Sequence, residues 1–384
     1  MKGKVPIALV VVVAAVGIGG SAGGAPGEPI RIGAIFSETG GLSSIGAPGL
    51  AGMRLAAEQV NARGGIFGRR IRIVAADSRS TGPAVASAVR SLIRNQRVVA
   101  LGGLNDSTLV LAAGPVAQRA RIPFVTAGAT LPSLPRRVGN TLFMAAYGDD
   151  AQAFAMADLA RTRLRARSAF VLLDRKADFT VALARFFRQR FAARGGTIVG
   201  TATYATGERD FTATMTRIRE LDDQPDVLFF SGLPSEAGPL VRQARAIGLA
   251  QPILSGDGFD TPLIGRVADN MADDVYFATH VSLASRAPRV LRFVAAYRQR
   301  YRRAPENAFA ALGYDTLNLL ADAIRRAGTD RPSAIRDALA KTRNFAMVTG
   351  TISYGPGRRP PRKPVTVMRV TNGRAAFYAA VLPR

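Results

Sequence analysis

Short apolar segments typical of β-strands alternate with helical segments along most of this 384-residue chain. In the first half, strands are predicted over residues 30–36, 71–76, 98–102 and 124–126, and a helix is predicted after each of the first three. Strands that alternate with helices in this way form βαβ units, whose parallel sheet is covered by helices on both faces. The alternation therefore predicts an α/β fold.

The same order begins again in the second half. Strands are predicted over residues 169–173, 198–203, 227–230 and 253–255, again with helices between them. Both halves carry Ala-Arg-Gly-Gly after the first helix, ending at Gly65 and Gly196. A common helix C-cap could also produce so short a repeated motif by chance. We interpret the chain as two similar, doubly wound (Rossmann-like) lobes in tandem.

The last quarter of the chain is too small for a domain of its own. It supplies helices near residues 289–301, 307–326 and 333–341, followed by three short strands. These elements most simply return to complete the two lobes, which several crossings then join. Ligands of open α/β sheets bind at the carboxyl ends of the strands, so we expect a binding cleft between the lobes.

Residue composition removes much conventional active-site chemistry. The chain has no cysteine and one histidine, which excludes disulfides, thiolate zinc sites, multi-histidine metal sites and the lipid-modified cysteine of a bacterial lipoprotein. No P-loop is present, and no GxGxxG opens a helix after a strand. We predict no metal and no cofactor, and we interpret His280 as a structural residue.

The formal net charge of +25 raises the question of nucleic-acid binding. Only five of the 52 basic residues are lysines, the arginines are spread along the chain, and tryptophan is absent. We interpret the excess as a solvated arginine-rich surface and expect no nucleic-acid partner. Attraction to an anionic membrane surface or an acidic partner remains an alternative.

The first 27 residues have the order of a secretory signal peptide. Lys2 and Lys4 precede an apolar run from Val5 to Ile18, and small residues follow to Ala25. The run is shorter than the about 20 residues that span a bilayer, although an uncleaved anchor is the alternative. We predict cleavage between Ala22 and Gly27 and a periplasmic protein that is not a lipoprotein.

Hydroxyl groups follow two strand ends of the first half. Ser107 and Thr108 begin a helix, where free backbone N–H groups and hydroxyls can hold a carboxylate or another small anion. The alternative is that Asp106 or Ser107 is only an N-cap. The loop of residues 126–130 adds the Thr130 hydroxyl and a close backbone approach.

In the second half, Asp257 lies between two glycines after a strand. Its carboxylate can receive an ammonium group, or it can form an Asx turn. An anion pocket on one lobe and a carboxylate on the other together describe a site for a zwitterion, an α-amino acid.

Nine segments give the chain a resemblance to the branched-chain amino-acid-type (leucine/isoleucine/valine-binding) periplasmic substrate-binding proteins of ABC transporters. They are Ile32–Gly40, Gly49–Ala57, Asn61–Gly68, Pro123–Thr130, Gln243–Gly248, Gly256–Gly258, Gly313–Asp315, Ile335–Leu339 and Val348–Ser353. The resemblance covers residues 28–384. It implies a type I periplasmic-binding fold that closes around its ligand, with three crossings between lobe 1 (28–147 and 281–347) and lobe 2 (148–280 and 348–384).

The resemblance also implies residue roles. Ser107 and Thr130, with the backbone of Gly128 and Ala129, would hold the ligand's carboxylate and amino group. Asp257 would receive the ammonium.

Several positions bear on the ligand's side chain. Phe179 stands where members often carry a tyrosine that closes over the ligand. Three positions depart from the family pattern: Ile45 replaces an aromatic residue, Leu233 a tyrosine, and Asp257 a glutamate. The side-chain pocket is therefore expected to be reshaped, and amides, urea and aromatic acids remain alternatives to a branched-chain amino acid.

The resemblance implies a monomeric receptor that binds a small molecule and delivers it to an inner-membrane ABC permease. The alternative is a periplasmic sensor or regulatory subunit for an amide or amino acid. An enzyme on the same scaffold is disfavoured because no nucleophile, base and orienting group converge on the cleft loops.

Overall fold

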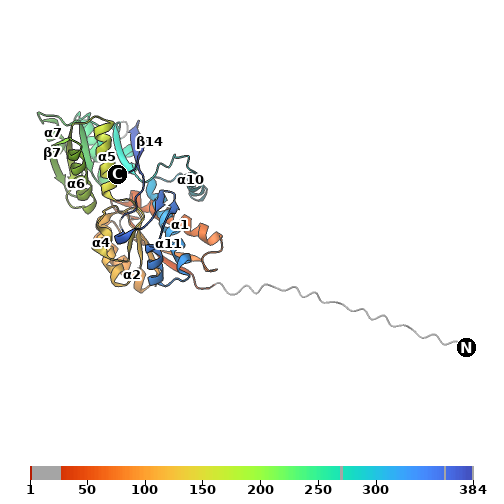
Figure 1. The fold of residues 1–384 in the computed structure, drawn as a ribbon. Helices are drawn as coiled ribbons and strands as arrows, with labels where there is room; N and C mark the ends of the chain where they lie inside the picture. Colours follow the sequence, from red (N-terminus) through yellow and green to blue (C-terminus); the bar gives the residue numbers. More distant parts are fainter. Residues whose placement is uncertain (2–26, 269–270, 359, 383–384) are drawn as a thin grey trace.

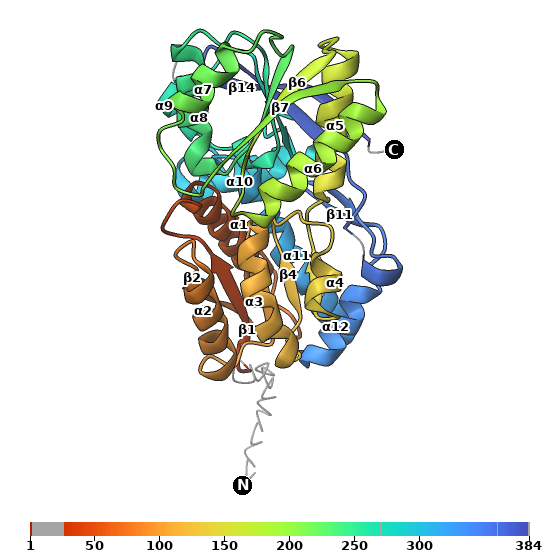
Figure 2. The same ribbon diagram turned by 90° about the vertical axis from the view of Figure 1, so that its left-hand side faces the viewer.

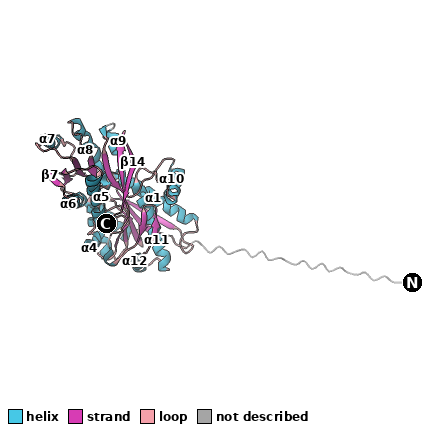
Figure 3. Cartoon of the chain, turned by 45° about the horizontal axis from the view of Figure 1, so that its top comes forward, coloured by secondary structure: helices cyan, strands magenta, loops and turns pink. Residues whose placement is uncertain are grey.

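The computed structural model describes residues 1, 27–268, 271–358 and 360–382 (Figure 1). Apart from its two end residues, the predicted signal peptide lies outside this description. Two lobes stack end to end, each with a sheet between helices (Figures 2 and 3). No helix of the described ranges is both long enough and apolar enough to cross a membrane.

Lobe 1 is built on a five-stranded parallel sheet of order β2-β1-β3-β4-β5. Its strands are β1 (Ile30–Phe36), β2 (Ile71–Asp77), β3 (Ala100–Gly103), β4 (Phe124–Thr126) and β5 (Leu142–Met144). Its helices are α1 (Ser43–Ala62), α2 (Gly82–Arg94), α3 (Ser107–Arg119), α4 (Leu134–Val138), α10 (Pro288–Tyr301), α11 (Ala308–Ala327) and α12 (Pro332–Ala340). Six of the seven residues of β1 are buried, as a central strand covered on both faces requires.

Lobe 2 is built on a seven-stranded sheet of order β14-β13-β10-β9-β8-β6-β7. Its parallel strands are β6 (Ser168–Asp174), β7 (Thr197–Tyr204), β8 (Val227–Ser231), β9 (Ile253–Ser255) and β10 (Val275–Thr279); β13 (Val365–Thr371) and β14 (Arg374–Val381) join as an antiparallel edge. Its helices are α5 (Asp149–Thr162), α6 (Asp178–Ala193), α7 (Thr212–Arg219), α8 (Pro234–Ala246), α9 (Leu263–Ala268) and the 3₁₀ turn η1 (Asp257–Phe259).

The two lobes repeat one topology. The order β7-β6-β8-β9-β10 in lobe 2 matches β2-β1-β3-β4-β5 in lobe 1, position by position. In each lobe the strand order reverses beside the first strand, which opens a crevice at the carboxyl ends of the strands. The predicted α/β fold with two doubly wound lobes is confirmed.

Helix α1 and helix α11 pack together without space for a side chain at their crossing. A Cβ on Gly52 would lie 1.8 Å from the Ala310 carbonyl oxygen, and one on Gly313 would lie 1.9 Å from the Gly49 carbonyl oxygen. Backbones can approach this closely only where glycine is present. The contact fixes a helix from the last quarter of the chain against the first helix of lobe 1.

The chain passes between the sheets three times: after β5, after β10, and between the hairpin β11 (Phe345–Met347)–β12 (Gly350–Ile352) and β13. Buried side chains join the first and third passages. Tyr354 donates its hydroxyl to the Met144 carbonyl (2.8 Å), and Lys363 donates its ammonium to the Ala145 carbonyl (3.0 Å). The hinge is therefore a polar, fully buried cluster.

Candidate functional site

Loops at the carboxyl ends of strands from both lobes meet around a small cavity. Its volume is about 10 Å³, and one water molecule needs about that much. Four of the residues predicted for the site line it: Ile45, Phe179, Leu233 and Asp257. The other lining residues were not predicted: Leu42, Asn105, Asp106, Pro234, Gly258 and Phe309. Side chains therefore fill most of the space between the lobes at this point.

A larger opening of about 240 Å³ lies beside this cavity. Leu42, Asp106 and Leu233 line both spaces, while Thr108 and Lys176 line only the opening. Since the two spaces share three residues from both lobes, we interpret the opening as the mouth of the cleft.

The start of helix α3 forms one wall. Asp106 is its N-cap and accepts a hydrogen bond from the Leu109 N–H at 2.9 Å, so the N-cap alternative holds for Asp106. Ser107 is 1% exposed, and its hydroxyl oxygen accepts from the Leu131 N–H at 3.1 Å. Ser107 thus lies behind the lining of the small cavity, with its own hydroxyl hydrogen still available to a further acceptor.

The loop after β4 also lies behind the cavity lining. Ala129 and Thr130 are each 1% exposed, and the Thr130 hydroxyl is hydrogen-bonded to the Asp149 carboxyl. Gly128 allows the loop to approach its neighbours, because a Cβ there would lie 2.7 Å from the Phe309 ring and 2.8 Å from Asn105 Oδ1.

Thr108 makes a contact between the lobes. Its hydroxyl oxygen accepts from the backbone N–H of Asp178, the first residue of α6, at 3.0 Å. The Asp178 carboxylate also pairs with Arg137 of lobe 1 at 3.1 Å. On the far wall, Phe179 follows Asp178 and packs near Gly258.

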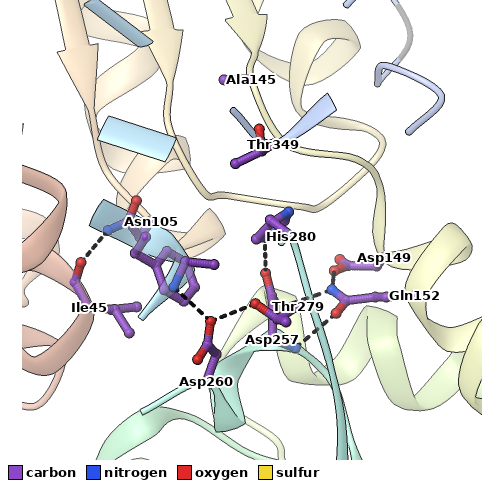
Figure 4. A network of polar contacts seen from close by, with 12 residues as sticks. Ile45, Asn105, Ala145, Asp149, Gln152, Asp257, Asp260, Thr279, His280 and Thr349 are labelled. Atoms are coloured by element: carbon purple, nitrogen blue, oxygen red, sulfur yellow. Dashed lines mark hydrogen bonds and ion pairs between the residues drawn. The ribbon is translucent and has the colours of Figure 1, made fainter. Parts of the chain in front are cut away.

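Asp257 lies at the centre of a buried polar network (Figure 4). Gln152 of α5 holds it at two points: the amide Nε2 donates to Asp257 Oδ1 at 3.1 Å, and Gln152 Oε1 accepts from the Asp257 N–H at 2.9 Å. His280 Nε2 lies 2.9 Å from Asp257 Oδ2. The Asp257 carboxylate, which lines the cavity, is therefore oriented by two neighbours with neutral side chains, Gln152 and His280.

His280, which the sequence led us to interpret as structural, is thus in direct contact with the predicted ammonium-binding group. One feature of the sequence could have located it: Asp257 and His280 each follow a strand by one or two residues, and these strands, β9 and β10, are neighbours. Burial lowers the pKa of His280, and this effect exceeds the opposing attraction of Asp257. The imidazole is therefore neutral near neutral pH.

Two further carboxyl groups near the cleft titrate in mild acid. Burial raises the pKa of Asp106 and of Asp260 to about 6 in each case. Asp260 accepts hydrogen bonds from Thr279 at 2.5 Å and from the Ala308 N–H at 3.0 Å. The negative charge around the cleft therefore declines as the pH falls through this range.

The lining of the site is mostly apolar. In the described ranges, no three His, Asp or Glu side chains gather closely enough to hold a metal ion. Apolar side chains line most of the small cavity, with the carboxyl groups of Asp106 and Asp257 and the half-buried amide of Asn105 among them. Such a lining suits a small ligand that has an apolar body and a cationic end.

Comparison with known proteins agrees with this fold. An amino acid binding protein of Pseudomonas aeruginosa is 32% identical over 239 residues, which is 62% of this chain and 63% of that relative. The crystal structure of the branched-chain amino acid transporter substrate binding protein LivJ from Streptococcus pneumoniae, in complex with isoleucine, has a TM-score of 0.87 and 31% identity over 92% of this chain and 100% of that one.

The leucine binding protein LivK of Thermotoga maritima gives a TM-score of 0.86 with 31% identity, covering 92% of this chain and 99% of that one. The family model described as "Periplasmic binding protein" matches residues 29–375. This chain belongs to the periplasmic binding protein family.

Proposed function

We propose that this chain is the solute receptor of an ABC importer, and that it captures an amino acid or a related small polar molecule between its lobes. The observation that carries the proposal is the position of Asp257, whose oriented carboxylate faces an apolar interlobe cavity. LivJ and the amino acid binding relative support the class of ligand. Closure around the ligand would stabilise one of two arrangements of the lobes, as in hinge-type binding proteins.

The ligand's apolar part would contact Ile45, Phe179 and Leu233, which line the cavity. Its ammonium would pair with Asp257. Its carboxylate would bind Ser107, Thr130 and the backbone of residues 128–129, which lie behind the cavity lining in this structure and would form the second half of the site. Because the closed cavity has room for about one water molecule, the lobes must separate or side chains must turn before a ligand enters.

The remaining parts of the proposal concern the whole protein. We infer that it is a monomer, that it binds and releases without chemical conversion, and that its partner is an inner-membrane permease. Residues 1–27 would act as a cleaved signal peptide, which places the mature protein in the periplasm without a lipid anchor. The contact of Tyr354 with Met144 supports a lobe boundary after residue 354 in the third passage, rather than at residue 347.

A ligand panel tests this proposal. The mature protein is mixed in turn with the twenty amino acids, short amides, urea, benzoate and short carboxylates, and thermal unfolding is followed. A ligand at about 100 times its Kd should add about 2.7 kcal/mol to the free energy of unfolding, which is readily seen as a rise in Tm. Calorimetry then gives the affinity. No thermal shift and no heat with any compound would overturn the proposal.

A further inference from the structure

The only histidine of the chain lies fully buried between both lobes and the hinge. The side chain of His280 is 0% exposed and follows β10 at the start of the second passage. Its ring stacks on Tyr147 of the first passage, with centroids 4.3 Å apart, and meets the Phe309 ring of lobe 1 edge-on at 5.9 Å. Two aromatic rings from separate segments therefore determine where the imidazole points.

The hydrogen bonds determine its tautomer. Nε2 lies 2.9 Å from Asp257 Oδ2, while Nδ1 is buried and has no partner in the described part of the chain. A carboxylate only accepts, so a neutral imidazole must carry its proton on Nε2 and donate it to Asp257. Protonation of His280 would add an N–H at Nδ1 that lacks a buried acceptor, and this is costly.

The charged groups around His280 differ in sign. Asp257 attracts the imidazolium and Lys363 of the third passage repels it. Tyr147, whose pKa burial raises well above its ordinary value, is neutral. Burial also raises the pKa of the nearby Asp149 carboxyl well above its ordinary value. Asp257 is thus the one attractive charge in direct contact with the ring.

We propose that His280 is the positioning residue for Asp257, and that the neutral imidazole is required for tight ligand binding. This inference rests on the proposed function, because it assigns the regulation of the same site. By donating its Nε2 proton, His280 holds the carboxylate toward the cavity without cancelling its charge. An imidazolium at the same position would compete with the ligand's ammonium for Asp257. Affinity should therefore fall in acid as His280 becomes charged.

The first test needs no ligand. Since the chain has one histidine, protein labelled with ¹⁵N-histidine and carrying no histidine tag gives a single imidazole signal. We expect the Nε2–H tautomer and a pKa below 6.5, and Asp257→Asn should lower that pKa further because it removes the attractive charge. A dominant Nδ1–H tautomer, or a pKa that does not change in Asp257→Asn, would overturn the inference.

The second test compares two variants in calorimetric titrations with L-isoleucine, or with whichever amino acid of the panel binds most tightly. His280→Phe keeps the ring stack and loses the donor, so affinity at about pH 7.5 should fall about ten- to a hundredfold, the scale for a hydrogen bond to a charged group. His280→Gln can present an amide N–H at the position of Nε2, and it should retain close to the wild-type affinity. Equal affinity for both variants and the wild type would contradict the inference.

The pH profile separates positioning from a merely structural role. Between about pH 7.5 and about pH 5.5, wild-type affinity should fall more steeply than that of His280→Gln, which has no imidazole to protonate. Asp106 and Asp260 titrate in both proteins, so their contribution cancels in the comparison. Ligand should also lower the imidazole pKa, because linkage is reciprocal.

Parallel pH profiles in the two proteins would overturn the inference while leaving the proposed function intact. Absence of binding by the wild type would instead overturn the proposed function, and the labelled imidazole would still show whether His280 donates to Asp257. Thermal unfolding of each variant confirms that it is folded before affinities are compared.

Discussion

At the scale of single residues, the proposed function depends most on Asp257. It is 3% exposed, and its neighbours Gln152 and His280 donate hydrogen bonds without bringing a counter-charge. A buried carboxylate in this position is stable when it accepts several hydrogen bonds, and it gains most from a cationic partner.

We predict that Asp257→Ala lowers ligand affinity by about 2–5 kcal/mol, the cost of removing one partner of a buried charge pair. The exposed Asp223→Ala, which removes the same charge far from the lining residues, is the matched control. Calorimetric titration of both variants checks the prediction. Equal affinities would place the ammonium-binding group elsewhere.

Lys363 in the hinge is a second residue whose substitution has a predictable effect, in this case on the pH dependence of stability. It is 0% exposed and donates to the Ala145 carbonyl and to Thr349 (2.5 Å), which in turn donates to Asp315 (2.7 Å). Burial lowers its pKa from the ordinary 10.5 to about 8. Between these two values the unfolded chain holds a proton that the folded chain releases, so the free energy of unfolding should rise with pH.

We predict that the free energy of unfolding rises by on the order of 3 kcal/mol from pH 8 to pH 10.5. This gain in stability should be lost again as the pH falls through 8. Lys363→Met should remove this part of the pH dependence. Urea unfolding of both proteins at several pH values from 8 to 10 measures it. Stability curves that run parallel across this window would contradict the assigned pKa.

Residue identities let the sequence predict part of the site. The loop after a predicted strand located Asp257, because all parallel strands end at one edge of a sheet, and the family resemblance added Ile45, Phe179 and Leu233; all four line the cavity. The sequence could not show that Ser107 and Thr130 turn to their own neighbours, since one hydroxyl can serve either a backbone N–H or a ligand. Asn105 was missed because its amide contacts Ile45, a residue far away in the sequence.

At the scale of helices and strands, the closest contact in lobe 1 is between α1 and α11. Its geometry leads to a prediction for Gly52→Ala. The new Cβ would lie 1.8 Å from the Ala310 carbonyl oxygen, a backbone atom, so the helices must move apart. We expect a loss of about 1–3 kcal/mol in the free energy of unfolding, the usual cost of overpacking.

Gly82→Ala is the control for the same substitution in a helix. Its Cβ would meet only the Ala112 side chain, at an ordinary 3.6 Å, and alanine favours helix. It should leave stability unchanged or raise it slightly. Urea unfolding followed by circular dichroism compares the variants. A Gly52→Ala protein as stable as the Gly82→Ala protein would show that the two helices can separate freely.

Periodicity predicted most elements because buried strands and one-sided helices carry clear patterns. It missed α5 (Asp149–Thr162), whose buried face includes Asp149 and Gln152 beside several alanines, and which therefore lacks a continuous apolar stripe. It also missed β5 (Leu142–Met144). Such elements take their form from the surrounding packing rather than from local preference.

At the scale of the whole molecule, contacts between the lobes set the balance between open and closed forms. Thr108 and Arg137 of lobe 1 both bind Asp178, and Ser44 binds Thr261 at 3.0 Å. Each such hydrogen bond contributes about 0.5–1.5 kcal/mol. Since the ligand would bridge the lobes, the same contacts should influence affinity without touching the ligand.

We predict that Thr108→Val shifts the ligand-free protein toward the open form and weakens binding by up to about tenfold. Small-angle X-ray scattering should give a larger radius of gyration for the ligand-free variant than for the wild type, and saturating ligand should bring both to one value. Thr212→Val, at an exposed position in α7, is the matched control. Identical scattering from the ligand-free proteins would show that the contact has no influence on closure.

The packing of α11 against α1 also bears on the order in which the molecule can form. Lobe 1 needs residues 308–340 to cover its sheet, and lobe 2 needs β13 and β14 to complete its edge. The core of lobe 1 therefore cannot be complete until residue 340 has left the ribosome. The first lobe of a nascent chain with this topology stays incompletely folded for most of its synthesis, and an incompletely folded chain is what a translocation channel for unfolded polypeptides accepts.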